Sequence, residues 1–253
     1  MKKINESILN KKYFIFDVDG TLVDSMSMWN SVDQKILHDN FGIEISLMDI
    51  KMFRDSVIYD AKNVQGDIYM AYYEAIVKYF NLGVSAEEFN RLRAELSNYL
   101  SVNELDYKPG AAEFLKLAKK LGKKIGVATT GVKRQYDIYE NKNQKMIKQA
   151  SLKKLVDATV HCEDVTNKKP DPEAYFKIME KLGAKPEECI VFEDSLNGVM
   201  AAKGAGLEVC SIYDDSAANE QDVIDKIADY KVESFYELIK SLGLESFENQ
   251  PEN

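Results

Sequence analysis

The sequence contains few cysteines and prolines and no long apolar run. Many cysteines are what define disulfide-rich proteins, and a long apolar run is what defines membrane proteins. Only three of its 253 residues are cysteines and five are prolines, and it contains no run of about 18 apolar residues. Three widely spaced cysteines in apolar surroundings are typical of buried free thiols, so we expect no disulfide framework, zinc site or redox chemistry. The basic N-terminal residues have no apolar segment behind them, which predicts a cytoplasmic protein with no membrane partner.

Positive charge is scarce relative to negative charge. The chain has 33 lysines and arginines against 42 acidic residues, which gives a formal net charge of −9. Because no basic stripe is available to neutralise a phosphate backbone, nucleic acid is not an expected partner. The composition, with 45% hydrophobic and 30% charged residues, is that of a globular protein. The length allows a main domain with a smaller second one and leaves the oligomeric state open.

Short apolar runs alternate with helical patterns along most of the chain. Strands that alternate with helices are typical of a parallel sheet that helices cover on both faces. The sequence therefore predicts an α/β fold with a Rossmann-like parallel sheet. The expected strands are Tyr13–Val18, Lys124–Thr129, Ala158–His161, Ile190–Glu193 and Val209–Tyr213.

A long segment without a convincing strand separates the first two of these runs. Its apolar residues recur every three or four positions, which predicts successive helices. We therefore expect an inserted α-helical domain at residues 25–106, within a core domain made of residues 1–24 and 107–253. The tail after Gly243 is expected to fray. The helices predicted in the insertion are Trp29–Phe41, Ile68–Phe80 and Ala86–Leu100.

Paired acidic residues follow two of the expected strands. Asp17 and Asp19 come after the first strand, where an extended chain points both side chains to the same side. Glu193 and Asp194 end the fourth strand. Parallel strands end at one edge of the sheet, where open α/β sheets bind ligands, and clustered carboxylates suit Mg²⁺. Taken alone, Asp19-Gly20 is also a turn signal, and Asp194 or Ser195 is also an ordinary helix cap.

Two further strand ends carry polar residues. Thr129 and Thr130 follow the second strand, where a hydroxyl and the amides of a turn can hold an anion. This turn is not a P-loop, because Val132 occupies the position of the required lysine. Lys169 stands in a loop fixed by prolines and can supply a point charge. A helix cap at Thr129 and a solvated lysine at position 169 are the simpler alternatives.

These four groups of residues are Asp17 with Asp19, Thr129 with Thr130, Lys169, and Glu193 with Asp194. Together they resemble the motifs of the haloacid dehalogenase-like (HAD) hydrolase superfamily, in particular of the members with a helical cap inserted after the first motif. They occur in the family's order, and they span most of the chain. The residues that carry the resemblance are Asp17–Ser25 for the first motif, Thr129 for the second, Lys169-Pro170 for the third and Phe192–Gly198 for the fourth.

This resemblance implies a Mg²⁺-dependent phosphatase that hydrolyses a small phosphorylated metabolite through an aspartyl-phosphate. Asp17 is then the nucleophile, and Asp19 is the general acid that protonates the leaving oxygen and later activates water. Thr129, Thr130 and Lys169 are the implied phosphate contacts. The implied metal ligands are Asp17, the Asp19 carbonyl, Asp194 and Glu193, the last directly or through water.

The resemblance leaves the substrate and part of the chain open. Trp29 and Arg54, in the predicted insertion, are candidate substrate-binding residues, although a core tryptophan and a solvated arginine are equally ordinary. The acid at Asp19 favours phosphate esters, whose leaving alkoxide needs a proton. Residues 133–155 form a long polar segment that departs from common relatives, and we expect it to bear on cap contacts or oligomerisation.

Two alternative functions stay open at this point. One is a β-phosphoglucomutase-like phosphotransferase. In such enzymes a histidine of the first cap helix helps to engage the general acid, and the matching position here is Trp29, which cannot relay a proton. The other alternative, a non-catalytic binding module, is disfavoured by the intact acids at Asp17, Asp19 and Asp194.

Overall fold

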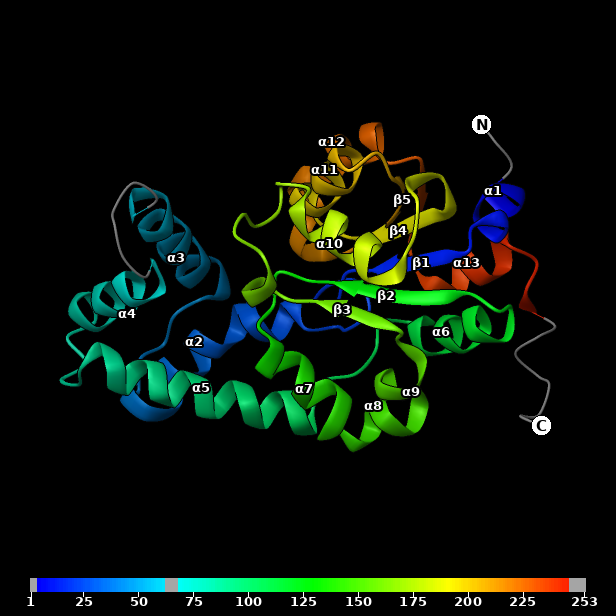
Figure 1. The fold of residues 1–253 in the computed structure, drawn as a ribbon. Helices are drawn as coiled ribbons and strands as arrows, with labels where there is room; N and C mark the ends of the chain where they lie inside the picture. The colour runs from blue at the N-terminus through cyan, green and yellow to red at the C-terminus, as the bar shows by residue number, and fades with distance from the viewer. Residues whose placement is uncertain (1–3, 62–67, 246–253) are drawn as a thin grey trace. The chain divides into compact units, whose positions relative to one another are not determined.

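The computed structural model describes residues 4–61 and 68–245. Most of the tail after Gly243, for which fraying is predicted, lies outside the described residues. The chain divides into two compact units (Figure 1). The first consists of Met1–Ser25 and Leu105–Asn253, and the second of Met26–Glu104.

The first unit is built on a six-stranded sheet with the order β3-β2-β1-β4-β5-β6. All neighbouring strands in it run parallel, which confirms the predicted α/β, Rossmann-like fold class. The last strand has three residues, one of them an exposed lysine, and is too short to give an apolar run in the sequence. The strands are β1 (Tyr13–Phe16), β2 (Lys124–Ala128), β3 (Ala158–Val160), β4 (Cys189–Glu193), β5 (Glu208–Ile212) and β6 (Tyr230–Val232).

Helices cover both faces of this sheet (Figure 1). Helices α10 and α11 contact strands β2 to β5 on one face, and α6 and α13 lie on the other. Residues 133–155 fold into α7, α8 and α9 and pack within this unit, α8 and α9 against α6. The α-helices of the first unit are α1 (Ile4–Asn10), α6 (Ala111–Lys120), α7 (Lys133–Asn141), α8 (Gln144–Gln149), α9 (Leu152–Leu155), α10 (Glu173–Leu182), α11 (Leu196–Gly204), α12 (Gln221–Ile227) and α13 (Phe235–Ser241).

Strand β1 alternates its side chains between the two faces of the sheet. The rings of Phe14 and Phe114 lie 5.8 Å apart on one face, and those of Phe16 and Phe192 stack there at 4.6 Å. Ile15 belongs to the opposite core, together with residues of α10 and α11. Because both faces are buried, the strand is apolar throughout. This packing fixes the positions of the ends of β1 and β4. It therefore also fixes the positions of the polar residues that follow these strands.

The second unit consists of helices packed on one another. Helix α2 contacts α3 and α5, and α4 contacts the same two helices. The sequence predicts three of these helices but not α3. Within this unit Arg93 pairs with the buried Asp33 at 2.8 Å. The helices are α2 (Met26–Phe41), α3 (Leu47–Ala61), α4 (Ile68–Tyr79) and α5 (Ala86–Asn103).

The prediction of buried thiols holds for two of the three cysteines and is wrong for Cys162. All three are free thiols; Cys189 and Cys210 are buried, and Cys162 is half-buried. Among the described helices, none has both the length and the apolar character that a bilayer span requires.

Candidate active site

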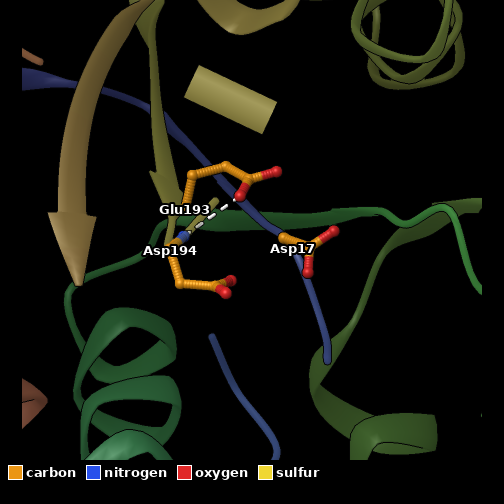
Figure 2. Close-up of side chains that lie close together, drawn as sticks. All are labelled: Asp17, Glu193 and Asp194. Carbon is orange, nitrogen blue, oxygen red and sulfur yellow. Dashed lines mark hydrogen bonds between the residues drawn. The ribbon is translucent and has the colours of Figure 1, made fainter. Parts of the chain in front are cut away.

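Three carboxylates meet at the carboxyl edge of the sheet. Phe16 of β1 and Phe192 of β4 are partners in register, so Asp17 and Glu193, the residues that follow them, come side by side. The main-chain amide of Asp17 also donates to the carbonyl of Phe192 at 3.0 Å. Asp17, Glu193 and Asp194 are buried, and each offers an oxygen within 4.8 Å of the others (Figure 2).

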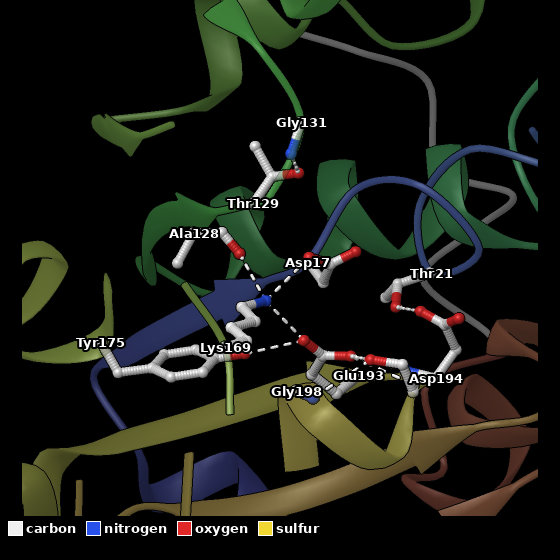
Figure 3. Close-up of polar contacts among 11 residues, drawn as sticks. Asp17, Thr21, Ala128, Thr129, Gly131, Lys169, Tyr175, Glu193, Asp194 and Gly198 are labelled. Carbon is white, nitrogen blue, oxygen red and sulfur yellow. Dashed lines mark hydrogen bonds and ion pairs between the residues drawn. The ribbon is translucent and has the colours of Figure 1, made fainter. Parts of the chain in front are cut away.

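The lysine of the third motif lies inside this cluster. The Nζ atom of Lys169 lies 2.8 Å from Asp17 Oδ1, 2.5 Å from Glu193 Oε1 and 2.9 Å from the Ala128 carbonyl oxygen (Figure 3). These three acceptors match the three donors of an ammonium group. Lys169 is buried, so the alternative of a solvated loop lysine is wrong.

Protein donors surround both carboxylate oxygens of Glu193. Oε1 accepts from Lys169 and, at 3.0 Å, from the hydroxyl of Tyr175. Oε2 accepts from the main-chain amides of Asp194 and Ser195 and from the Ser195 hydroxyl. A carboxylate has about four lone-pair sites, so these donors fill it. Glu193 therefore holds Lys169 against Asp17.

Asp194 is held by the turn that follows β1. The hydroxyl of Thr21 donates to Asp194 Oδ1 at 2.5 Å. Gly20 has a φ of +91°, and a β-carbon there would stand 2.3 Å from Asp194 Oδ2. The cap of helix α11 is Ser195, whose side chain accepts from the amide of Gly198, so Asp194 is not used as the cap. The sequence alone does not indicate this role of Thr21, although Thr21 directly follows the Asp-Gly pair.

Asp19 lies beyond the carboxylate cluster and is half-buried. Two hydroxyl groups donate to the same oxygen, Asp19 Oδ1: Ser25 Oγ at 2.6 Å and the hydroxyl of Tyr139 at 2.8 Å. Both donors come from the first unit, but Tyr139 stands on α7, far along the chain. Nothing in the sequence indicates either of them as a partner of Asp19.

The end of β2 brings Thr129 to the same region. Thr129 is buried, and its hydroxyl accepts from the amide of Gly131 at 3.0 Å. A β-carbon on Gly131 would stand 3.2 Å from Thr129 Oγ1 and 3.1 Å from Asp19 Oδ2. Both side-chain oxygens therefore lie close to Gly131 in this turn. Thr130 is exposed.

The two remaining candidates belong to the second unit. Trp29 is half-buried on α2, and Arg54 on α3 donates to the side chain of Asn30 at 2.9 Å. Their roles in substrate binding stay predictions.

Burial and charge shift the pKa values of the cluster. Burial raises the pKa of Asp17 to about 7, although Lys169 opposes this shift. Burial, together with the charges of Glu193 and Asp17, raises the pKa of Asp194 well above its ordinary value. Burial lowers the pKa of Lys169, but its two carboxylate partners outweigh this effect and leave it well above 10.5.

Full ionisation of this cluster would leave more negative than positive charge in a buried place. Three carboxylates face one ammonium group, and an uncompensated buried charge is costly. A divalent cation would remove this excess. The oxygen donors of Asp17 and Asp194 are of the kind that Mg²⁺ prefers, so the residues present fit that ion.

The family is established by comparison with known proteins. The family model for haloacid dehalogenase-like hydrolases matches residues 11–206, and the chain belongs to this family of enzymes. The resemblance stated from the four motifs is thus confirmed.

Individual relatives agree with this assignment. The chain is 30% identical to YhcW of Bacillus subtilis over 239 residues, which cover 94% of this chain and 99% of that protein. It is 27% identical to the phosphorylated carbohydrates phosphatase of Thermotoga maritima, over 77% of this chain and 81% of that one. The crystal structure of CbbY from Rhodobacter sphaeroides in complex with phosphate shares the fold, with a TM-score of 0.67, 22% identity and coverage of 92% and 100%.

Proposed function

We propose that this protein is a Mg²⁺-dependent phosphatase that hydrolyses a small phosphorylated carbohydrate through an aspartyl-phosphate on Asp17. The observation that carries the proposal is the buried Lys169, which contacts both Asp17 and Glu193 beside Asp194. Similarity to the phosphorylated carbohydrates phosphatase of Thermotoga maritima supports the substrate class.

The first step transfers the phosphoryl group to Asp17. Because Lys169 holds Asp17 Oδ1 at 2.8 Å, we assign the attack to Oδ2. The Oδ2–phosphorus bond forms while the ester bond between phosphorus and the sugar oxygen breaks. Asp19 gives its proton to the leaving oxygen, which departs as an alcohol.

The second step releases phosphate. Asp19, now ionised, takes a proton from water, whose oxygen forms a bond to phosphorus. The bond between phosphorus and Asp17 Oδ2 breaks, which restores the Asp17 carboxylate and the protonated Asp19. The positive charge of Lys169 and the hydroxyl of Thr129 stabilise the charge on the phosphoryl oxygens in both steps. The exposed Thr130 stays a candidate for substrate contact.

Asp17, Asp194 and the main-chain carbonyl of Asp19 are the groups that would hold Mg²⁺. When bound, the ion would offset the charge of the phosphoryl group and align it with Asp17. We assign Glu193 a different task, because protein donors already fill both of its oxygens. It positions Lys169 and contributes to the metal site through charge.

The test is a measurement of phosphate release from a panel of phosphorylated sugars and sugar alcohols, with and without Mg²⁺. Asp17→Asn should lose about a thousandfold or more in kcat, because an amide is a poor nucleophile. The control is Asp157→Asn, since Asp157 precedes β3 at the opposite edge and pairs with Lys119. Retention of activity in Asp17→Asn, or no release from any substrate by the wild type, would contradict the proposal.

A further inference from the structure

Helix α7 brings a buried tyrosine to the proposed general acid. The side chain of Tyr139 is 1% exposed, and its hydroxyl donates to Asp19 Oδ1 at 2.8 Å. The helix belongs to residues 133–155, the segment that departs from the common family pattern in the sequence. Neither the four motifs nor the proposed reaction assigns this residue a role.

The two oxygens of Asp19 face different surroundings. Oδ1 accepts from Tyr139 and from Ser25 Oγ, the latter at 2.6 Å. Oδ2 lies 3.1 Å from the point that a β-carbon on Gly131 would occupy, and Thr129 Oγ1 lies 3.2 Å from the same point. One oxygen is therefore turned toward two hydroxyl donors, and the other toward the turn at the end of β2.

We propose that Tyr139 is a positioning residue that holds Asp19 Oδ1 and thereby makes Oδ2 the atom that exchanges protons with the leaving group and with water. The inference rests on the proposed phosphatase function and adds a residue to it. The proton passes from Asp19 Oδ2 to the leaving sugar oxygen in the first step, and from water back to Oδ2 in the second. Tyr139 keeps its own proton throughout.

The surroundings of Tyr139 keep its hydroxyl in place as a hydrogen-bond donor to Asp19. The hydroxyl of Tyr139 donates to Asp19 Oδ1 at 2.8 Å, and the residue is 1% exposed, so solvent does not compete for this hydrogen bond. The ring belongs to the packed interior and fixes the oxygen through only two side-chain torsions. A hydroxyl held in this way limits rotation of the Asp19 carboxylate.

Helix α7 also supplies a matched control. Tyr136 is 3% exposed, and its buried hydroxyl has no hydrogen-bond partner within the described structure. Tyr139→Phe and Tyr136→Phe therefore remove the same atom from the same helix, and both keep the ring that fills the core. Only the first change removes a contact to Asp19.

The experiment measures kcat and KM for both variants over a series of phosphate esters, from nitrophenyl phosphate to alkyl and sugar phosphates. Tyr139→Phe should lower kcat about tenfold or more for alkyl and sugar esters, with little change in KM. The loss should be small for nitrophenyl phosphate, whose leaving group needs no proton. Tyr136→Phe should match the wild type. In an Asp19→Asn background, Tyr139→Phe should add little further loss.

The outcomes separate this inference from the proposed function. An inactive wild type, or an active Asp17→Asn variant, overturns the function and the inference together. If the wild type is active and the Asp17→Asn variant is inactive, the proposed function is upheld. In that case, a Tyr139→Phe variant that matches the wild type, or loses the same factor for every ester, overturns the inference alone. Thermal unfolding of each variant checks that the fold is retained.

Discussion

The α-carbon of Gly198 lies directly against the carboxylate of Glu193, so that a β-carbon at position 198 would stand 1.8 Å from Glu193 Oε1. Gly198 is in the first turn of α11, and its amide donates to the cap residue Ser195 at 3.1 Å. The absence of a side chain lets the start of the helix approach the carboxylate, where the helix dipole favours negative charge. The position of Lys169 depends in turn on Glu193.

The first prediction follows from this close approach. Gly198→Ala should displace Glu193, loosen Lys169 and lower phosphatase kcat about tenfold or more, because a shift of about 1 Å at a catalytic site is costly. Gly204→Ala is the control on the same helix, since its β-carbon would meet its nearest neighbour, the Pro172 Cβ, at 3.6 Å. We expect that control to keep full activity. Equal kcat values for the two variants would contradict the role of Gly198.

The sequence predicts strands β1 to β5 and misses β6, the last strand of the described sheet. Strands β1 and β4 are apolar because both of their faces are covered. Strand β6 has three residues and includes Lys231, so no periodic pattern marks it. The sequence does not predict helix α3 of the second unit, although it has 15 residues, because its apolar residues do not form one clear stripe.

The same distinction applies to the site. Asp17, Glu193 and Asp194 are found from the sequence because each directly follows or ends a strand, and the sheet then brings them together. The tyrosine donors to the acids of the site cannot be found in this way. Tyr175 and Tyr139 reach the acids from helices, and nothing in their local sequence indicates which carboxylate each one contacts.

Metal binding can be tested without an assay of activity. Burial and like charge raise the pKa values of Asp17 and Asp194, so Mg²⁺ should stabilise the folded protein by relieving this repulsion. At about 100 times its Kd the ion would add about 2.7 kcal/mol, or about 5–10 °C in Tm for a chain of this size. EDTA should reverse the shift. Asp194→Asn should lose most of the response, whereas Asp157→Asn should keep it; an equal response in both would reject the assigned site.

The salt bridge between Lys108 and Asp214 leads to a pH prediction. Burial raises the pKa of Asp214, but the hydrogen bonds from Lys108, at 2.8 Å, and from Ser216 outweigh it, so the pKa is lowered from 3.8. A carboxylate with a lowered pKa stabilises the fold above its unfolded pKa, and this stability is lost as the pH falls through the folded value.

Asp214→Asn should therefore lower the free energy of unfolding at pH 7 by about 1–3 kcal/mol. Its difference from the wild type should shrink as the pH falls below about 3.8, where the wild-type carboxyl takes up its proton. Urea unfolding at a series of pH values measures both quantities. Asp215→Asn, at an exposed neighbour, should change stability by less than about 0.5 kcal/mol. A difference for Asp214→Asn that stays constant down to pH 3 would show that charge is not its cause.

The last prediction is that the enzyme hydrolyses its substrate rather than isomerising it. The mutase-like alternative calls for a histidine near the start of the first helix of the insertion, and this chain has Trp29 there, on α2. An indole N–H donates a hydrogen bond but cannot accept or relay a proton. Water should therefore remain the acceptor of the phosphoryl group, and the aspartyl-phosphate should break down without a sugar phosphate present.

The measurement incubates the enzyme with β-glucose 1-phosphate and a trace of the 1,6-bisphosphate, and follows glucose 6-phosphate and inorganic phosphate together. We expect phosphate to accumulate with little or no glucose 6-phosphate. Trp29→His introduces a side chain that can relay a proton. Any gain in isomerisation is expected in this variant and not in the wild type. Rapid formation of glucose 6-phosphate by the wild type, with little phosphate released, would favour the mutase, because the phosphoryl group would then pass from Asp17 to sugar faster than to water.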